Sequence, residues 1–335
     1  MSAYLQQANF LIIIIVFSVS LLVLSKSADL LVNNAVKLSK VMGLSEVVIG
    51  ATIVSLGTTL PELSAAVVSA LQGNGSFGLG NAIGSVITNT SLILGLSALF
   101  GVIPVTKMTS QKLSILNSVV VLLILPMIIQ RIRGSESPLS QWIGLVFLLL
   151  VPVYFIHLLK REKKTLDPQE EISTEEKPSG NTLVMIVLIF ISAVFVSLSA
   201  STLVSSAEVV ASRVGIPDVV IASTIVAFGT SVPELTTALT SAKNGYGGLA
   251  IGNVMGANIL NIILVSGASI TLSVGGLIVP DSFYVVHIPA MVIILAIFSF
   301  VAYNTQKNEI SKKEGVLLIS VYFIYIVGNL ISAFM

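Results

Sequence analysis

The chain has no cysteine, and only 10% of its 335 residues are charged. Without cysteine, disulfides, cysteine metal sites and thiol catalysis are excluded. The two histidines, His157 and His287, are isolated, so a helical pair of metal-ligating histidines is absent as well. The formal net charge of +1 gives no indication of a nucleic-acid partner. A soluble domain usually carries about 25% charged residues, so the shortage of charge places this chain in a membrane.

Long apolar segments make up most of the sequence, and many approach the roughly 20 residues that a spanning helix needs. Because a bilayer offers no water to backbone polar groups, these segments must be helices. The first one has no basic region before it and no evident cleavage site, so we expect it to remain as a helix. The pattern predicts an all-α polytopic membrane protein with ten spans, at residues 8–41, 45–71, 77–100, 112–131, 138–159, 182–213, 217–242, 248–273, 282–304 and 314–334.

One long charged stretch, from Lys160 to Gly180, separates the fifth span from the sixth. It is too polar to pack in a core, and we expect a flexible cytoplasmic loop. The predicted organisation is a first five-helix repeat at residues 1–159, a linker at 160–181 and a second five-helix repeat at 182–335.

The distribution of lysine and arginine predicts the orientation of the chain, because cytoplasmic loops carry an excess of both. With the N-terminus outside, thirteen of these residues, Lys112 among them, fall on the inner side. Only Arg131, Arg133 and Arg213 fall on the outer side. We therefore expect a multi-pass protein of the cell membrane with both termini outside and the central loop in the cytoplasm.

The two halves of the sequence repeat each other at an offset of 172 residues. The segment GTTLPEL at 57–63 matches GTSVPEL at 229–235, and 20 of 45 positions are identical between residues 51–95 and 223–267. Each half has five predicted spans, and an odd number makes the second copy enter the membrane from the opposite side. Such inverted repeats place their site near the membrane midplane, between the two copies. The paired glycines Gly80 and Gly84, and likewise Gly252 and Gly256, are spaced for close helix packing.

Glu62 and Glu234 are the acidic residues that lie near the middle of apolar segments, and they occupy matched positions of the repeat. A carboxylate at the bilayer centre costs at least about 2.5–3.5 kcal/mol. Two that face each other need a cation or shared protons to neutralise them. A protonated carboxyl that only ties helices together is the structural alternative, but the symmetric pair favours an ion site.

A proline precedes each glutamate and predicts a break in the second and seventh helices. Pro61 and Pro233 have no amide hydrogen, so carbonyl oxygens upstream, around 55–59 and 227–231, lose their helical donors. Hydroxyl groups stand in the same turns, at Thr58, Thr59, Thr230 and Ser231. Broken helices of transporters present such carbonyls to cations.

Amide side chains complete the predicted ligand set. Asn81 and Asn253 follow a glycine at the start of the third and eighth spans, and Asn89 and Asn261 lie eight residues further on. Calcium takes six to eight oxygen ligands from carboxylates, carbonyls, amides and water. Sodium also accepts oxygen, whereas soft metals would need sulfur or imidazole, which this region lacks.

The two motifs, each followed by a GN-xx-G segment, resemble the paired alpha repeats of the sodium/calcium exchanger family, within the calcium/cation antiporter superfamily. The resemblance covers nearly the whole chain. It implies alternating access, with calcium and its counter-ion competing for overlapping sites. By resemblance, Glu62 and Glu234 bind calcium, Thr58 and Thr230 lend backbone carbonyls, Ser55 and Ala227 lend carbonyls to sodium, and Ser85 and Asn89 are polar ligands on the third span.

Three positions depart from the family pattern. Val86 replaces an asparagine, Ala257 stands where a serine often contributes to a sodium site, and Asn261 stands where many members carry an aspartate. One carboxylate and one hydroxyl are therefore missing. This weakens the case for full sodium stoichiometry and leaves coupling to protons open.

The function predicted from these residues is a secondary antiporter that exchanges Ca²⁺ for Na⁺. A proton/calcium exchanger on the same fold is the second interpretation, since two neighbouring glutamates can carry protons. A passive cation channel is a third, less favoured because a tight site slows conduction. An enzyme is least favoured, and no cofactor or catalytic residue is predicted. The expected partners are calcium, a monovalent counter-ion and the lipid bilayer, and the sequence identifies no protein partner.

Overall fold

The computed structural model describes residues 2–133, 138–165, 181–214, 227–305 and 308–334. Within these ranges the chain is mostly helical, with β1 (Ile103–Pro104) paired antiparallel to β2 (Glu309–Ile310) and an isolated bridge between Leu139 and Leu277. Seven of the described helices are long and apolar enough to cross a membrane, and one bent pair of helices forms an eighth candidate. The chain is therefore an all-α, multi-pass membrane protein.

The helices of the first half follow the apolar segments closely. A short α1 (Ser2–Gln7), which the sequence did not predict, precedes Asn9, whose side chain caps the next helix by accepting a hydrogen bond from the amide of Leu11 (3.2 Å). The following elements are α2 (Phe10–Met42), α3 (Glu46–Ile49), the π-helix η1 (Gly50–Val54), α4 (Ser55–Thr58), α5 (Leu60–Leu71), α6 (Gly75–Thr88), the π-helix η2 (Asn89–Ile93), α7 (Leu94–Phe100), α8 (Lys107–Arg133) and α9 (Gln141–Thr165).

The second half begins after the linker, and the first part of its predicted span at 217–242 lies outside the described residues. The described elements of this half are α10 (Thr182–Arg213), α12 (Ala227–Gly229), α13 (Val232–Lys243), α14 (Gly247–Leu260), the π-helix η4 (Asn261–Val265), α15 (Ser266–Leu272), the π-helix η5 (Phe283–His287), α16 (Ile288–Asn304) and α17 (Lys312–Phe334).

The repeat of the sequence is also a repeat of secondary structure. Helix α6 begins at Gly75 and α14 at Gly247, and each runs into a π-helix, which begins at Asn89 and Asn261 respectively. Both pairs of positions are 172 residues apart (247 − 75 and 261 − 89). A π-helical turn is rare and occurs often at functional sites. Its presence at both matched positions shows that the two copies share local structure as well as sequence.

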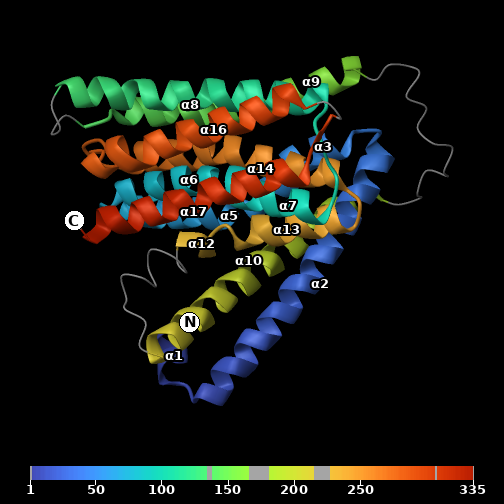
Figure 1. Ribbon diagram of the computed structural model, residues 1–335, viewed down its shortest axis with the longest axis horizontal. Helices are drawn as coiled ribbons and strands as arrows, with labels where there is room; N and C mark the ends of the chain where they lie inside the picture. Colours follow the sequence, from blue (N-terminus) through green and yellow to red (C-terminus); the bar gives the residue numbers. More distant parts are fainter. Residues whose placement is uncertain (1, 134–137, 166–180, 215–226, 306–307, 335) are drawn as a thin grey trace.

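Two segments form the centre of the molecule. In the most apolar stretch of each segment, 89% of the residues are buried in Gly247–Leu272 and 72% in Gly75–Phe100. The same share is only 22% in α2 and in Gln141–Lys160. Helices α2 and α10 pack along each other on one side of this centre, and α8 and α9 lie on the opposite side (Figure 1). The central pair carries the matched asparagines, so the fold places them where the surroundings are most buried.

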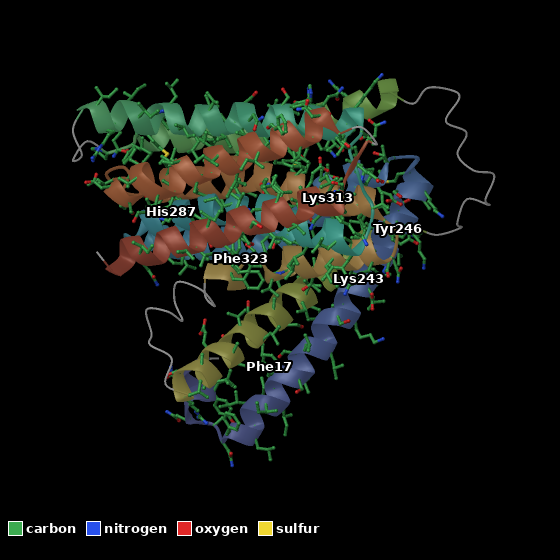
Figure 2. All side chains as sticks on the ribbon, viewed as in Figure 1. Phe17, Lys243, Tyr246, His287, Lys313 and Phe323 are labelled. Atoms are coloured by element: carbon green, nitrogen blue, oxygen red, sulfur yellow. The ribbon has the colours of Figure 1, made fainter. Side chains whose placement is uncertain are left out.

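The two ends of the helical bundle differ in their polar side chains. Lys243 and Lys313 lie toward the same end (Figure 2), and Lys243 lies over the ring of Phe100 at 4.7 Å. Helix α8 finishes at the other end (Figure 1). The ends of α13 and α7 and the start of α17 therefore share one side of the molecule.

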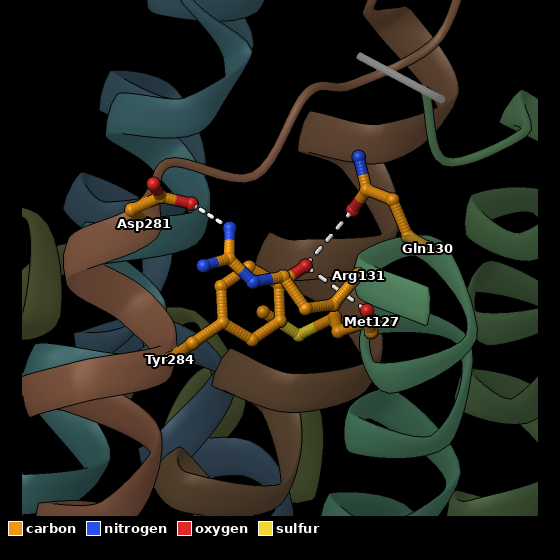
Figure 3. Close-up of polar contacts among 5 residues, drawn as sticks. All are labelled: Met127, Gln130, Arg131, Asp281 and Tyr284. Atoms are coloured by element: carbon orange, nitrogen blue, oxygen red, sulfur yellow. Dashed lines mark hydrogen bonds and ion pairs between the residues drawn. The ribbon is translucent and has the colours of Figure 1, made fainter. Parts of the chain in front are cut away.

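A group of polar contacts ties the final turns of α8 to the start of η5 (Figure 3). Arg131 pairs with Asp281 and lies over the ring of Tyr284, 5.3 Å from its centre. The Tyr284 hydroxyl donates to the carbonyl of Met127 (3.0 Å) and to Oε1 of Gln130 (3.2 Å). Both side chains of the ion pair are largely exposed, so we expect it to contribute at most about 1 kcal/mol.

Two details differ from what the sequence predicts. Helix α9 continues to Thr165, so the first six residues of the predicted linker are helical. Lys112, expected in an inner loop, is instead fully buried within α8 and donates a hydrogen bond through Nζ to the carbonyl of Val47 (2.6 Å). Sequence counts treat every lysine near the end of an apolar segment as solvated, and this one is not.

Candidate functional site

The second apolar segment bends by 43° between Thr58 and Leu60, which confirms its predicted break. Thr59 lies at the bend, and Pro61 stands in the first turn of the helix that follows it. Because proline has no amide hydrogen, the carbonyl of Gly57, four residues earlier, loses its helical donor. The bend brings the polar turn at 57–59 and the first turn of α5 together at one point of the membrane.

The matching segment of the second half is interrupted in the same way. Helix α12 ends at Gly229, and α13 begins at Val232 with Pro233 in its first turn. Between them Ser231 has φ −89° and ψ 3°, close to the values of Thr59 at φ −82° and ψ −4°. The two breaks therefore share a backbone conformation, and each places a glutamate in the first turn after it.

Glu62 and Glu234 are both fully buried. None of their four carboxylate oxygens accepts a hydrogen bond from the described residues. Since an unpaired carboxylate is very costly away from water, this arrangement calls for a bound cation or for protons. It is the feature that the sequence predicts for an ion site.

Two hydrogen bonds join the broken segments of one half to the central helix of the other. The hydroxyl of Thr58 donates to Oδ1 of Asn253 (3.3 Å), and that of Thr230 donates to Oδ1 of Asn81 (3.0 Å). Thr58 matches Thr230, and Asn81 matches Asn253, so the two bonds are reciprocal. Asn81 and Asn253 thus hold the threonines at the breaks, a role that sequence alone did not distinguish from ion binding.

Asn89 and Asn261 lie deeper, at the start of the two π-helices, and both are fully buried. All four oxygen and nitrogen atoms of their side-chain amides lack a hydrogen-bond partner among the described residues. Buried polar groups are nearly always paired, so these matched amides are available to bind an ion. Both residues were predicted from the sequence as ligands, and their surroundings fit that prediction.

The hydroxyl groups divide unequally between the two halves. Ser231 donates to the hydroxyl of Ser85 (3.4 Å), which links the second break to α6. The matched pair is Thr59 and Ala257, and Ala257 has no hydroxyl to offer. Accordingly, the buried Thr59 hydroxyl has no partner among the described residues.

Ser55 and Ala227 are the two positions expected to lend carbonyls to sodium, and hydrogen bonds are described for the Ser55 carbonyl. This carbonyl accepts a hydrogen bond from the amide of Thr59 (2.9 Å) and another from the hydroxyl of Thr58 (3.4 Å). In this conformation, then, the oxygen is already engaged. Ala227, at the matched position, begins α12, and its backbone alone is described.

Sequence reasoning missed Asn258. It lies at the position matched to Val86, so the asparagine missing from the first half is present in the second. Its side-chain nitrogen donates to the hydroxyl of Thr90 (2.8 Å), next to Asn89, while its Oδ1 is buried without a partner. Asn258 could have been identified from the sequence by comparing Val86 with the residue 172 positions later.

The donor set consists of oxygen atoms from carboxylates, amides, hydroxyls and carbonyls. In the part of the chain that the structure describes, no three histidine, aspartate, glutamate or cysteine side chains gather around one point. Such a set suits hard cations such as calcium and sodium. With two carboxylates, the site can balance one divalent ion.

Comparison with known proteins gives the same picture. The family described as sodium/calcium exchanger protein matches residues 12–160 and 184–331. A membrane protein of Methanocaldococcus jannaschii, whose name assigns no function, is 34% identical over 92% of this chain and 95% of its own length. The sodium/calcium exchanger MaX1 of Methanosarcina acetivorans is 29% identical over 95% of this chain and 97% of its own length.

A solved structure agrees over the same extent. The sodium-calcium exchanger NCX_Mj, in crystals soaked without sodium or calcium, superimposes with a TM-score of 0.77 and 28% sequence identity. The match covers 95% of this chain and 99% of that one. The likeness therefore extends over nearly the whole chain.

Proposed function

The chain belongs to the sodium/calcium exchanger protein family, and on that premise we propose that it is a secondary antiporter that exchanges Ca²⁺ for Na⁺. The family and the fold support cation/calcium antiport. The observation that carries the proposal is the pair of fully buried glutamates, at matched positions, whose carboxylates lack partners among the described residues. A calcium ion would neutralise both charges, and removing it leaves a site that other cations must refill.

The proposed ion site is made of oxygen ligands from both halves. Glu62 and Glu234 hold calcium, and Asn89 and Asn261 extend the site along the central helices. The further ligands are backbone or hydroxyl oxygens of Ser55, Thr58, Thr59, Ser85, Ala227, Thr230 and Ser231. No cofactor takes part, because transport needs only the binding and release of ions.

Exchange on one site requires that it open to each side in turn. We propose ten spans arranged as two inverted five-helix repeats, at residues 1–159 and 182–335, joined by the linker at 160–181. The reciprocal bonds Thr58–Asn253 and Thr230–Asn81 support this arrangement, because contacts of the form i–j and j–i are the mark of a two-fold axis. When this two-fold axis lies in the membrane plane, exchanging the conformations of the two repeats converts an inward-open state into an outward-open state.

The proposed orientation places both termini outside and the linker in the cytoplasm of a cell-membrane protein. Lys243 and Lys313, both assigned to the inner side, lie at one end of the bundle, in agreement with this orientation (Figure 2). A cysteine introduced at Ser173 should resist impermeant thiol labelling from outside intact cells, and it reports alone because the chain has no cysteine of its own. Ready labelling from outside would reverse the orientation without affecting the repeat.

Coupling to protons is the second candidate, and it has a specific basis. Ala257 and Asn261 remove one hydroxyl and one carboxylate that a sodium site could use. If sodium binds weakly, the two glutamates themselves can take up protons when calcium leaves.

Calcium uptake into proteoliposomes decides between these possibilities. Vesicles loaded with sodium, potassium or acid buffer are diluted into medium with labelled calcium, at clamped voltage. The sodium gradient is expected to drive uptake, and the Glu62→Gln variant supplies the control for leak. Uptake that follows only the proton gradient would replace sodium by protons. Equally fast uptake without any opposing gradient would indicate a channel.

A further inference from the structure

Lys112 is a fully buried lysine whose place in the protein the ion site does not explain. It lies in α8, one of the outer helices, and its Nζ donates to the carbonyl of Val47 at 2.6 Å. Burying an ammonium group is costly unless specific partners receive it. This acceptor is one of its partners, a backbone oxygen of α3, which is the first section of the broken second segment.

Tyr154 makes a second contact of the same kind. This tyrosine, buried in α9, donates from its hydroxyl to the carbonyl of Ala51 at 3.0 Å. Val47 and Ala51 are four residues apart and therefore lie on one face of the helix. Two outer helices thus contact the same face of the segment that leads to Ser55 and Thr58.

The same two carbonyls also border the central helix α14. A Cβ atom added at Gly252 would lie 2.4 Å from the Val47 oxygen, and one added at Gly256 would lie 2.7 Å from the Ala51 oxygen. At Gly256 it would also lie 2.6 Å from the hydroxyl of Ser55. The backbone of α14 therefore rests directly on this segment, and each carbonyl stands between an outer donor and an inner glycine.

We propose that Lys112 and Tyr154 are positioning residues of the ion site. They fix the register of residues 47–55 against α14. Because Thr58 meets Asn253 of α14 only in this register, the donors control the geometry of the calcium ligands from outside the site. This inference rests on the proposed function, since it assumes that the site binds calcium.

The second half carries different side chains at the matched positions. The position matched to Lys112 is Tyr284, whose hydroxyl donates to Met127 and Gln130 of α8 (Figure 3). The position matched to Tyr154 is Ile326, which has no hydroxyl. Tyr284 therefore offers a matched control, because its described hydrogen bonds go to an outer helix.

The test compares Tyr154→Phe, Lys112→Met and Lys112→Arg with Tyr284→Phe in the full-length purified protein. Equilibrium binding of labelled calcium is measured in detergent, and thermal unfolding is measured with and without calcium. Removal of one hydrogen bond is expected to weaken calcium binding by about three- to tenfold in Tyr154→Phe. Lys112→Met is expected to weaken it at least as much, Lys112→Arg to restore most of it, and Tyr284→Phe to leave it unchanged.

Several outcomes would overturn the proposal. One is a Tyr154→Phe protein that unfolds at lower temperature but binds calcium as the wild type does, since that shows a purely structural role. Another is an equal loss of affinity in Tyr284→Phe. If Lys112→Met does not fold, the calcium affinities of Tyr154→Phe and Lys112→Arg still test the proposal. Failure of the proposed function is distinct, because then the wild type itself binds no calcium or binds it independently of Glu62.

Discussion

In the proposed ion site, the first half has Ser85 at the position where the second half has Ala257. Ser85 accepts a hydrogen bond from Ser231. In the other half, Thr59 matches Ser231 and Ala257 matches Ser85, and the buried Thr59 hydroxyl has no partner among the described residues. The glutamates and the deep asparagines are nevertheless identical in the two halves. The comparison separates a symmetric set of proposed calcium ligands from an asymmetric set of hydroxyls, and we expect the asymmetric set to decide which counter-ion is coupled to calcium.

The central helix α14 packs closely against the first broken segment. Gly252 and Gly256 of α14 have backbone atoms of α3 and η1 within 2.4–2.5 Å of an added Cβ position. Both distances are shorter than van der Waals contact, so the backbone leaves no room for a side chain at either glycine.

The largest effect is expected at the glutamates, where the two halves should behave alike. Glu62→Gln and Glu234→Gln should each reduce calcium transport by roughly a hundredfold or more, since loss of one buried charge partner costs about 2–5 kcal/mol. Initial rates of labelled calcium uptake into proteoliposomes measure this. Near-normal uptake by either variant would remove that glutamate from the site.

The control for these variants is Glu309→Gln, which removes a carboxylate from β2, away from the break residues. It should transport calcium at the wild-type rate. All three proteins should elute as single species on size-exclusion chromatography, which separates loss of the site from loss of the fold. A strong defect in Glu309→Gln would show that uptake responds to any loss of charge.

The close packing of α14 predicts the next largest effect. In Gly256→Ala the new methyl group meets backbone atoms of Ala51 that cannot move aside, and overpacking of this kind costs about 1–3 kcal/mol. Thermal unfolding of the purified variant and of the wild type measures this cost, and equal midpoints would contradict the close contact between α14 and η1.

A smaller effect, of opposite sign, is expected where the missing ligands are restored. Ala257→Ser gives Thr59 a hydroxyl partner, and Asn261→Asp adds a third carboxylate near the other two. We expect the double variant to respond to external sodium at lower concentrations than the wild type, by about tenfold, since a charge-assisted ligand contributes about 1.5–3 kcal/mol. Calcium efflux from loaded vesicles at fixed pH gives the sodium dependence.

The reverse substitution tests whether that gain is specific. Ser85→Ala removes the hydroxyl from the first half and should weaken the sodium response, while calcium binding is largely retained. If Ser85→Ala and the double variant leave the sodium response unchanged, the hydroxyl asymmetry has no part in coupling. Efflux that ignores sodium in every variant but follows an acid pulse would favour the proton exchanger.

The smallest effect is expected at the outer arginine contact. Asp281→Asn removes the partner of Arg131, but both side chains are well exposed, so the stability should fall by at most about 1 kcal/mol. Calcium uptake should be unaffected, because no ligand moves. A large fall in the unfolding temperature would mean that the contact between α8 and η5 supports the fold more than its exposure indicates.

Much of this architecture can be read from the sequence, and the reason is the repeat. Apolar length predicts the helices, proline predicts the breaks, and the offset of 172 residues identifies Glu62 and Glu234 as a pair. These signals are local or internal to the chain. The roles assigned to the individual ligands stay predictions until ions are measured.

What the sequence could not supply are contacts between elements that no motif relates. The burial of Lys112, the hydroxyl contact of Tyr154 and the pairing of Asn258 with Thr90 each join helices that are distant in the chain. A lysine near the end of an apolar segment ordinarily lies in water, so composition rules count it as solvated. The π-helical turns at Asn89 and Asn261 were equally hidden, because an extra residue in a turn leaves no mark on the apolar pattern.

The reciprocal threonine–asparagine bonds have a consequence for biosynthesis. Thr58 and Asn253 are 195 residues apart, and Asn81 and Thr230 are 149 apart. Contacts over such distances form late, since closing long loops costs entropy that no earlier contact has offset. A newly made first half can therefore insert its helices in the membrane while its ligands remain unarranged. If the chain binds calcium as proposed, we expect affinity for the ion only after the second half has been made and has docked on the first.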